Sequence, residues 1–312
     1  MKRISLILFL AVVCSSCGFF RGDPYRNTPT TGHAIIATDE TFMPIIEAEL
    51  EVFKAIYGYT EFKSSYLPEI DAFAQLLNGD VQLIIASRPL SKDEVAFFHK
   101  KKIYPRQTKV ATDAIALIVS KQSSDTVVTI SQIKDLLTGK LTSWNQINPT
   151  SKSGKISAVF DNQKSSIINY LVDSICGGKL VKTNVFALDY NKDVIEYTSS
   201  HPGVLGFIGA SWISNDNDSL HLSFHKKIKV CSVSNNSRPN VENSYKPYQA
   251  YMAEGIYPLT RDIYIINAEP RNGLATGFSA FLASDKGQRI ILKSGILPAI
   301  APTRVVKTRK DF

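Results

Sequence analysis

Short apolar runs rich in β-branched residues alternate along this chain with segments in which apolar residues recur every three or four positions. One such segment places Phe42, Ile46, Leu50, Phe53 and Tyr57 on a single helical face. The apolar runs that predict strands span His33–Thr38, Val81–Ser87, Ala114–Ser120, Ile156–Phe160, Gly203–Gly209 and Asp262–Ile266. This alternation predicts an α/β protein with largely parallel sheets.

Further helices are expected after the fourth predicted strand and near the end of the chain. Ile168–Ile175 repeats the helical spacing, and Gly277–Gly295 carries an apolar face that needs a sheet to cover it, which the first third of the chain supplies. Glycines stand where helices are expected to stop, at Gly79, Gly139, Gly177 and Gly295.

The first seventeen residues have the pattern of an export signal. Lys2 and Arg3 precede the apolar stretch Ile4–Val13, which is far shorter than the ~20 residues that span a bilayer as a helix. Small residues then lead to Cys17, as in the lipoprotein cleavage box, so we expect residues 1–17 to be a lipoprotein signal peptide and Cys17 to carry the lipid. Residues 18–32 read as a polar tether. An ordinary cleaved signal with an incidental cysteine is the alternative.

Composition favours a soluble globular protein, with 44% hydrophobic and 21% charged residues in 312. The formal charge of +8 falls by two when the signal is removed, and the remaining excess favours an acidic partner: nucleic acid, anionic lipid or a small anion. Export argues against nucleic acid. Cys176 and Cys231 remain in the mature chain, and the sequence leaves open whether they pair.

Three strand-to-helix junctions are rich in hydroxyl and charged residues. Because helix N-termini offer free N–H groups and open α/β sheets bind ligands at the carboxyl ends of their strands, these junctions predict an anion site. Each junction alone has a simpler interpretation as a helix cap, and Ser91 with Glu94 forms a capping box. The candidate ligand-binding residues are Asp39, Thr41, Phe42, Ser87, Arg88, Asp161, Lys164, Ser165 and Ser166.

The order of segments over nearly the whole mature chain resembles the phosphate-binding proteins of bacterial phosphate ABC transporters, the PstS family. The segments that carry the resemblance are Thr41–Phe42, Ile84–Leu90, Thr112–Val119, Ile130–Trp144, Pro202–Ile208 and Tyr257–Tyr264. The resemblance implies the type II periplasmic binding protein fold, with two α/β lobes joined by two crossing strands. Residues 33–110 plus 263–312 would form lobe I, and residues 111–262 would form lobe II.

Two departures from the family's pattern concern the ligand. Arg88 replaces the aspartate that accepts a proton from hydrogen phosphate, and the family's arginine ahead of its Ser-Gly-Thr donors aligns with Phe160 or a near neighbour. Ser165 and Ser166 match those donors approximately. We expect Arg88 to supply the lost charge and Asp39 or Asp161 to supply the acceptor, for phosphate or a similar tetrahedral oxyanion.

Other function classes find less support in the sequence. The nucleophile-elbow and zinc-protease motifs are missing, so we expect neither an enzyme nor a metal or cofactor site. His221 and His225 lie in an alternating segment that predicts a strand. The expected partners are the anion, an ABC transporter permease and, through the lipid anchor, a membrane, with the protein a monomer in the periplasm or at the cell surface. A surface lipoprotein or sensor accessory with a changed or lost ligand is the alternative.

Overall fold

The computed structural model describes residues 26–178, 184–214 and 219–302. The predicted signal peptide with Cys17, most of the tether and the basic residues after 302 lie outside this range. The last tether residues pack on the body of the protein, because Asn27 Oδ1 accepts the Leu274 N–H at 2.8 Å. Cys176 and Cys231 are buried and free.

One sheet runs through the whole molecule in the order β2-β1-β3-β11-β4-β8-β6-β7. In what we call the first half, β1, β2 and β3 are parallel, and in the second half β6, β7 and β8 are parallel. The bounds of these strands are β1 (Gly32–Asp39), β2 (Thr60–Leu67), β3 (Leu83–Ala86), β6 (Ser157–Phe160), β7 (Val185–Ala187) and β8 (Val204–Gly209).

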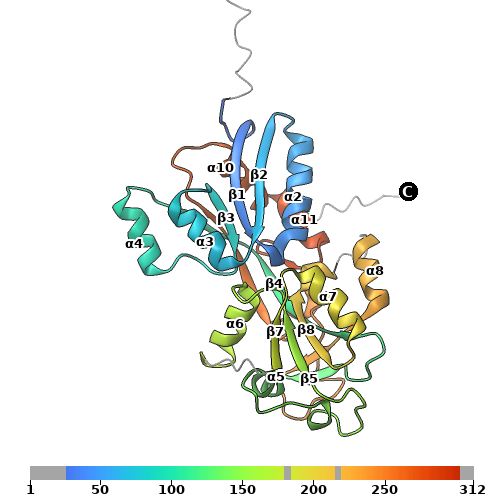
Figure 1. Cartoon of the computed structure of the whole chain (residues 1–312). Helices are drawn as coiled ribbons and strands as arrows, with labels where there is room; N and C mark the ends of the chain where they lie inside the picture. The colour runs from blue at the N-terminus through green and yellow to red at the C-terminus, as the bar shows by residue number, and fades with distance from the viewer. Residues whose placement is uncertain (1–25, 179–183, 215–218, 303–312) are drawn as a thin grey trace, which may run out of the picture.

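Two antiparallel strands link the halves. The long β4 (Arg106–Ser120) runs from one half into the other, and β11 (Thr260–Asn267) pairs with it and with β3 (Figure 1). The short strands β9 (Ile228–Val230) and β12 (Leu297–Pro298) also pair with β4, while β5 (Val127–Thr129) and β10 (Ser232–Ser234) form a separate small sheet. Parallel pairing is therefore correct within each half but not at their connection.

Helices cover both halves. The first half carries α2 (Met43–Ile56), α3 (Glu69–Asn78), α4 (Lys92–Lys100), α10 (Leu274–Leu282) and α11 (Asp285–Lys293). The second half carries α5 (Ile130–Leu137), α6 (Ser166–Ser174), α7 (Asn191–Ser200), α8 (Ser219–Lys227) and α9 (Gln249–Ala253). The 3-10 helices that lie wholly within the described residues are η2 (Glu40–Phe42), η3 (Trp144–Gln146) and η5 (Ala210–Trp212).

The predicted local signals hold with one exception. Ser91 and Glu94 form the expected capping box of α4, and Gly79 ends α3 in the left-handed region at φ 86°. The segment His221–His225 is wrong as a strand, because it lies in α8. Its alternation of apolar and polar residues is too short to distinguish a strand from a helix.

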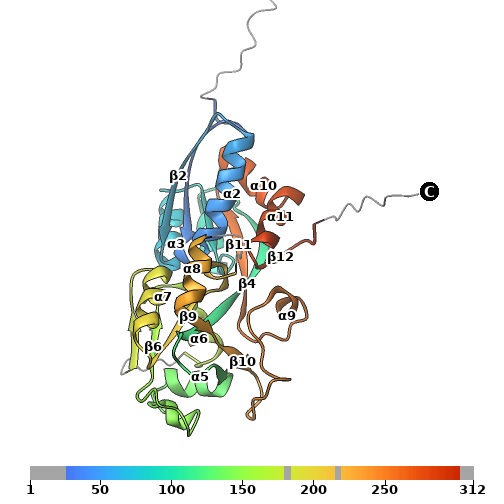
Figure 2. The same cartoon turned by 90° about the vertical axis from the view of Figure 1, so that its right-hand side faces the viewer.

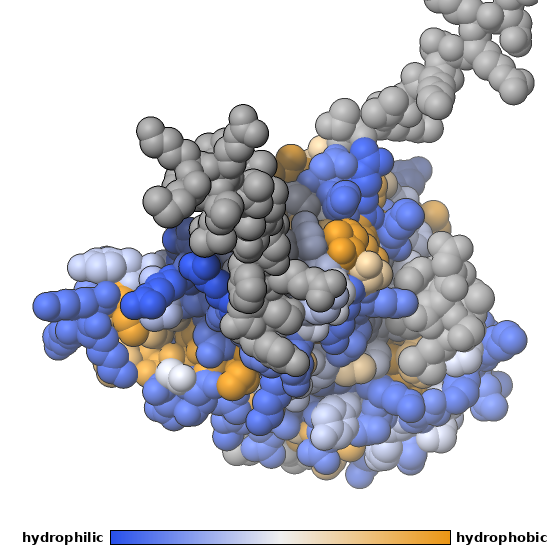
Figure 3. All heavy atoms as spheres, turned by 90° about the horizontal axis from the view of Figure 1, so that it is seen from above, coloured by the Kyte–Doolittle hydropathy of each residue, from blue (hydrophilic) through white to orange (hydrophobic). Residues whose placement is uncertain are grey.

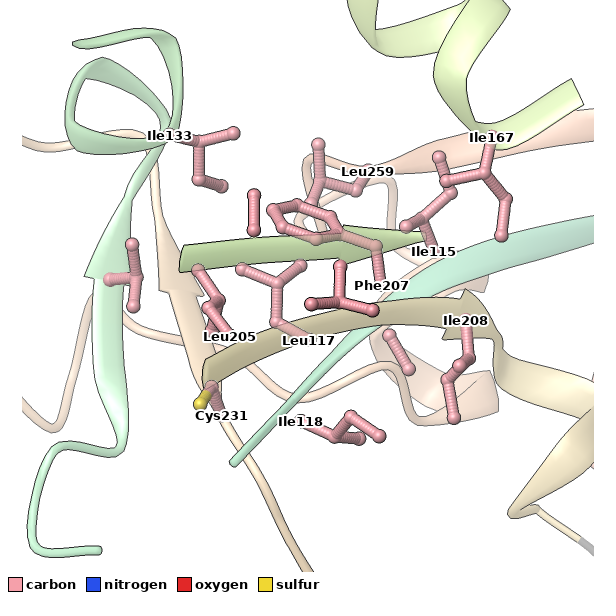
Figure 4. Close-up of a cluster of buried hydrophobic side chains, with 14 of the residues drawn as sticks. Ile115, Leu117, Ile118, Ile133, Ile167, Leu205, Phe207, Ile208, Cys231 and Leu259 are labelled. Carbon is pink, nitrogen blue, oxygen red and sulfur yellow. The ribbon is translucent and has the colours of Figure 1, made fainter. Parts of the chain in front are cut away.

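The hydrophobic core follows the two halves. Strands β4 and β8 supply Ile115, Leu117 and Phe207 to a cluster that α5 and α6 cover (Figure 4). In the first half, α2 and α10 bury Phe53 and Phe278 with ring centroids 5.5 Å apart. Seen from above the first half, hydrophilic residues dominate the described surface and hydrophobic ones gather in smaller areas (Figure 3).

Candidate functional site at the junction of the two sheet halves

Polar side chains are buried where β1, β4, β6 and β11 come together. β1 ends in Thr38 and Asp39, Asp161 directly follows β6, and pairing of the crossing strands sets Asp113 opposite Arg261. All are at most 5% exposed. We call the following residues the junction cluster: Thr38, Asp39, Thr41, Asp113, Asp161, Ser166 and Arg261.

Arg261 is the buried cation of this cluster. Its Nη2 donates to Asp113 Oδ2 at 3.2 Å, and its Nη1 donates to the Ser166 hydroxyl at the start of α6. The guanidinium also lies over the Phe42 ring, 4.8 Å from its centroid. These contacts fix the charge on three sides, so the guanidinium is held in place before any ligand binds.

The turn between β1 and α2 is fastened to the second half of the sheet. Asp39 Oδ1 accepts the Thr41 N–H at 3.0 Å, which caps η2. The Thr41 hydroxyl then donates to Asp161 Oδ2 at 3.2 Å, and the Thr41 carbonyl accepts from Ser211 and Trp212 at 3.3 and 3.1 Å. This turn therefore makes the contact between the halves at the cluster.

Asn191, the first residue of α7, joins several of these groups. Its Nδ2 donates to Glu40 Oε2 at 2.6 Å and to Asp161 Oδ2 at 3.1 Å, and its Oδ1 accepts the Gly209 N–H at 3.0 Å. The Asn191 backbone N–H also donates to Glu40 Oε2, at 3.1 Å. The Glu40 carboxylate thus occupies the N-terminus of α7, a position that favours negative charge.

Several buried polar atoms in the cluster have no hydrogen-bond partner among the described residues. They are Thr38 Oγ1, Asp39 Oδ2, Asp113 Oδ1, Asp161 Oδ1 and Arg261 Nε. Buried polar atoms in folded proteins are nearly always paired, with protein or with water. A group of them from four chain segments is therefore what a ligand site needs: one unused donor on a cation and several unused acceptors.

Burial shifts the carboxyl groups toward their neutral forms. It raises the pKa of Asp161 to about 6, with the nearby charge of Asp39 acting in the same direction. It raises the pKa of Glu40 to about 8, against the hydrogen bonds from Asn191. Burial also raises the pKa of Asp113, although the Arg261 charge opposes this. A carboxyl that keeps its proton can donate as well as accept.

Six of the nine predicted ligand residues lie at this junction. Asp39, Thr41, Asp161 and Ser166 belong to the cluster, and Phe42 contacts Arg261. Ser165 is 1% exposed and caps α6, accepting the Ile168 N–H at 3.4 Å. These residues come from two of the three junctions that the sequence singles out.

The polar groups of the other three residues bind carboxyl groups that are not among the residues of the junction cluster. One of these, Glu69, is buried near the cluster, because burial and the charge of Asp39 raise its pKa and the charge of Arg261 opposes this. Ser87 donates through its N–H and hydroxyl to Glu69 Oε1, at 2.6 and 2.7 Å. The Arg88 guanidinium forms two hydrogen bonds with Glu94, at 2.9 and 3.0 Å, and its side chain is 44% exposed. Lys164 pairs with Asp71 of α3 at 2.9 Å, also exposed to solvent.

The sequence interpretation missed the residues at the centre of the cluster. Arg261 and Asp113 are charged residues next to the apolar stretches Ile263–Ile266 and Ala114–Val119 of their strands, and burying a charge is costly unless it is paired, so this pattern was an available signal. Asn191 and Glu40 carry no such signal. Only the fold places the start of α7 beside the turn after β1.

Comparison with known proteins assigns the chain to a family. The model described as "PBP superfamily domain" matches residues 23–286. The chain belongs to this superfamily. Among curated proteins, the phosphate-binding protein PstS of Staphylococcus epidermidis strain ATCC 35984 is 23% identical over 90% of this chain and 84% of the relative. PstS of Staphylococcus aureus strain USA300 is 23% identical over 96% and 88%.

Solved structures share the fold. A putative phosphate ABC transporter substrate-binding protein from Clostridium perfringens, with bound phosphate, has a TM-score of 0.72 at 19% identity and covers 86% of this chain and 100% of its own. A phosphate transport receptor from Vibrio cholerae has a TM-score of 0.62 at 18% identity, covering 86% and 100%. The predicted resemblance and the type II binding-protein fold are confirmed.

The described residues contain no helix that is both long and apolar enough to cross a bilayer. In the same part of the chain, no group of three or more histidine, cysteine or acidic side chains is arranged to hold a metal ion.

Proposed function

We propose that this protein captures inorganic phosphate, or a similar tetrahedral oxyanion, at the junction cluster and delivers it to the permease of an ABC importer. The observation that carries the proposal is the buried guanidinium of Arg261, held by Asp113 and Ser166 with its Nε unused. The relatives are named phosphate-binding proteins, and one structural neighbour holds phosphate. Both support the same ligand.

The unused carboxyl oxygens fit a ligand that carries its own protons. Hydrogen phosphate has hydroxyl groups that can donate to Asp39 Oδ2, Asp113 Oδ1 or Asp161 Oδ1. Sulfate has no proton at neutral pH, so it would leave these acceptors unpaired at a cost of about 1–3 kcal/mol. The carboxyl groups therefore select hydrogen phosphate over sulfate, while the positive charge of Arg261 attracts the anion.

Residues 33–110 plus 263–312 are proposed to form lobe I, and residues 111–262 lobe II. The hydrophobic cores support this division, since Val110 and Ile263 belong to one cluster while Ala114 and Leu259 belong to another. Thr41 bonding to Asp161 would then hold the lobes closed over the ligand, assisted at the rim by Lys164 and Asp71.

Location, anchoring and the remaining expectations rest on the sequence. Cys17 would be the lipidated first residue of a monomeric mature protein, held at a membrane in the periplasm or at the cell surface. Binding rather than catalysis is the proposed activity, as the names of the relatives support.

Calorimetric titration of the purified chain with phosphate and with sulfate tests the proposal. We expect saturable binding of phosphate, at least tenfold tighter than sulfate. Arg261→Ala should weaken phosphate binding by more than tenfold, equivalent to ~1.4 kcal/mol, because it removes the buried cation. The control is Arg88→Ala, which removes a cation that is engaged with Glu94 and exposed, and should change the affinity by no more than about twofold.

Two results would contradict the proposal. Binding of neither anion by the folded protein would exclude an oxyanion receptor. A large loss of phosphate affinity with Arg88→Ala and none with Arg261→Ala would show that the anion binds at Arg88, on the surface, and not at the junction cluster. Circular dichroism of each variant shows whether it is folded, and Arg261→Lys retains the charge if Arg261→Ala does not fold.

A further inference from the structure

A second site is suggested by a basic pocket away from the junction cluster. The pocket has a volume of about 540 Å³ and lies between β4, α8, β9 and the segment before α9. It is lined by Lys121, Lys229 and Lys246 together with His225 and Tyr248, and no acidic residue is among its lining residues. A cavity of ~300–1,000 Å³ is the size that takes a small organic ligand.

Within residues 26–178, 184–214 and 219–302, no carboxylate forms an ion pair with the lysines that line this pocket. Lys121 donates to the carbonyl of His225 at 2.9 Å, and Lys229 donates to the carbonyl of Ser123 at 2.7 Å. Neither lysine forms an ion pair within the described residues, and the ammonium group of Lys246 has neither an ion pair nor a hydrogen bond there, although its backbone carbonyl accepts the Tyr248 N–H at 2.7 Å. By contrast, Lys109, Lys140, Lys164 and Lys227 each pair with a carboxylate.

Both halves of the molecule contribute to the pocket wall. Gly295, in the turn after α11, lines it with Ser214, and a Cβ on Gly295 would lie 2.2 Å from Ser214 Cβ. Gln249 also lines the pocket and donates to the carbonyls of Leu292 and Ile296 at 2.6 and 2.8 Å. Figure 2 shows α9 below α11 and β12, which is where this contact is made. The pocket wall is therefore held by contacts between several segments of the chain and does not depend on a single loop.

We propose that this pocket binds a small anion with two or more negative groups, of the polyphosphate or organic phosphate type. Lysine ammonium groups are point charges that suit phosphate oxygens, and lysines gathered in one concavity repel one another until an anion neutralises them. Two of the ammonium groups are already fixed by carbonyls, so less entropy is lost when the ligand binds. The exposed face of Tyr248 offers an organic part of the ligand a surface to pack on.

Titration with inorganic tripolyphosphate, in buffer with saturating phosphate, tests this second site. We expect one saturable site on the wild-type chain, weakened by added salt. Lys246→Ala and Lys121→Ala should each weaken binding by at least tenfold. The matched control is Lys92→Ala, an exposed lysine of α4 outside the pocket, which should stay within about twofold of the wild type.

Arg261→Ala separates the two sites. If tripolyphosphate binds at the basic pocket, Arg261→Ala leaves the tripolyphosphate affinity unchanged even though it weakens phosphate binding by more than tenfold. Loss of tripolyphosphate binding with Arg261→Ala and not with Lys246→Ala would place it in the junction cluster and overturn the proposal. Equal losses with Lys246→Ala and Lys92→Ala, or no saturable binding, would also overturn it.

Discussion

Single residues here show how strongly burial acts on charge. Glu49 of α2 is 0% exposed, and neither of its carboxyl oxygens has a hydrogen-bond partner among the described residues. Burial raises its pKa from 4.5 to about 9. The folded chain therefore keeps a proton that the unfolded chain releases between these values, so the stability supplied by neutral Glu49 is lost as the pH rises from 4.5 toward 9.

Replacing Glu49 should stabilise the protein at neutral and alkaline pH. Glu49→Met keeps the length and helix preference of the side chain and removes the buried carboxyl, so we expect a gain of about 1–3 kcal/mol at pH 8 and a much smaller one at pH 4.5. Urea unfolding at both pH values measures this. Glu51→Gln, exposed on the same helix, is the control. A gain that does not depend on pH would show that packing, not the charge of Glu49, is responsible.

At the scale of elements, the start of α7 holds the two halves together. The Asn191 side chain donates hydrogen bonds to Glu40 and Asp161 and accepts one from the Gly209 N–H, and these bonds link η2, β6 and β8 to the helix. Glutamine has the same amide group, but its extra methylene would shift that group away from these three partners. Substitution here should therefore affect stability more than the removal of one hydrogen bond would.

Asn191→Asp should destabilise the protein in a pH-dependent way. The aspartate keeps an acceptor for Gly209 but places a third carboxyl beside Glu40 and Asp161, whose pKa values are about 8 and 6. Repulsion grows as these groups ionise, so the loss of stability relative to wild type should be larger at pH 8 than at pH 5. Thermal unfolding at both values measures it, with the exposed Lys192→Gln as control. If the loss of stability were equal at pH 5 and pH 8, it would come from the missing amide donor alone and repulsion between carboxylates would be excluded as its cause.

At the scale of the whole molecule, close approach of the halves depends on a glycine. A Cβ at Gly209, the last residue of β8, would lie 2.5 Å from Thr41 Cγ2 and 3.1 Å from the Thr41 carbonyl oxygen. The backbone itself would accept alanine, since Gly209 has φ −67° and ψ 138°. Alanine at this position should therefore act by separating the halves and not by straining the chain.

Gly209→Ala should weaken phosphate binding and leave the molecule more open. We expect at least a tenfold loss of affinity and, in saturating phosphate, a larger radius of gyration by small-angle X-ray scattering than the wild type shows. Gly58→Ala is the matched control, because a Cβ there meets nothing within 4 Å. Wild-type affinity and size for Gly209→Ala would show that contact between Thr41 and Gly209 does not control closure.

The fold and much of the site follow from local patterns in the chain. The predicted strands correspond to β1, β3, β4, β6, β8 and β11, because each is a β-branched run bounded by turn residues. Asp39, Thr41, Ser165 and Ser166 were found through the same logic, since helix starts after buried strands need caps and offer free N–H groups. β2 was missed because its eight residues, TEFKSSYL, are mostly polar, and β5, β7, β9, β10 and β12, of two or three residues each, are too short to show a period.

The sequence by itself determined the alternation of strands and helices, the caps and the family likeness, because these depend on residues close together in the chain. Which arginine is buried at the junction cluster, Arg88 or Arg261, depends on the tertiary structure. Arg88 was the expected cation, but Glu94 in the first turn of α4 binds it at the surface. Arg261 takes the buried position because β11 crosses beside β4, setting it opposite Asp113 across 148 residues of sequence. The spacing of residues along the chain does not predict a pairing between strands so far apart in sequence, so the Arg261–Asp113 pair becomes visible only in the folded structure.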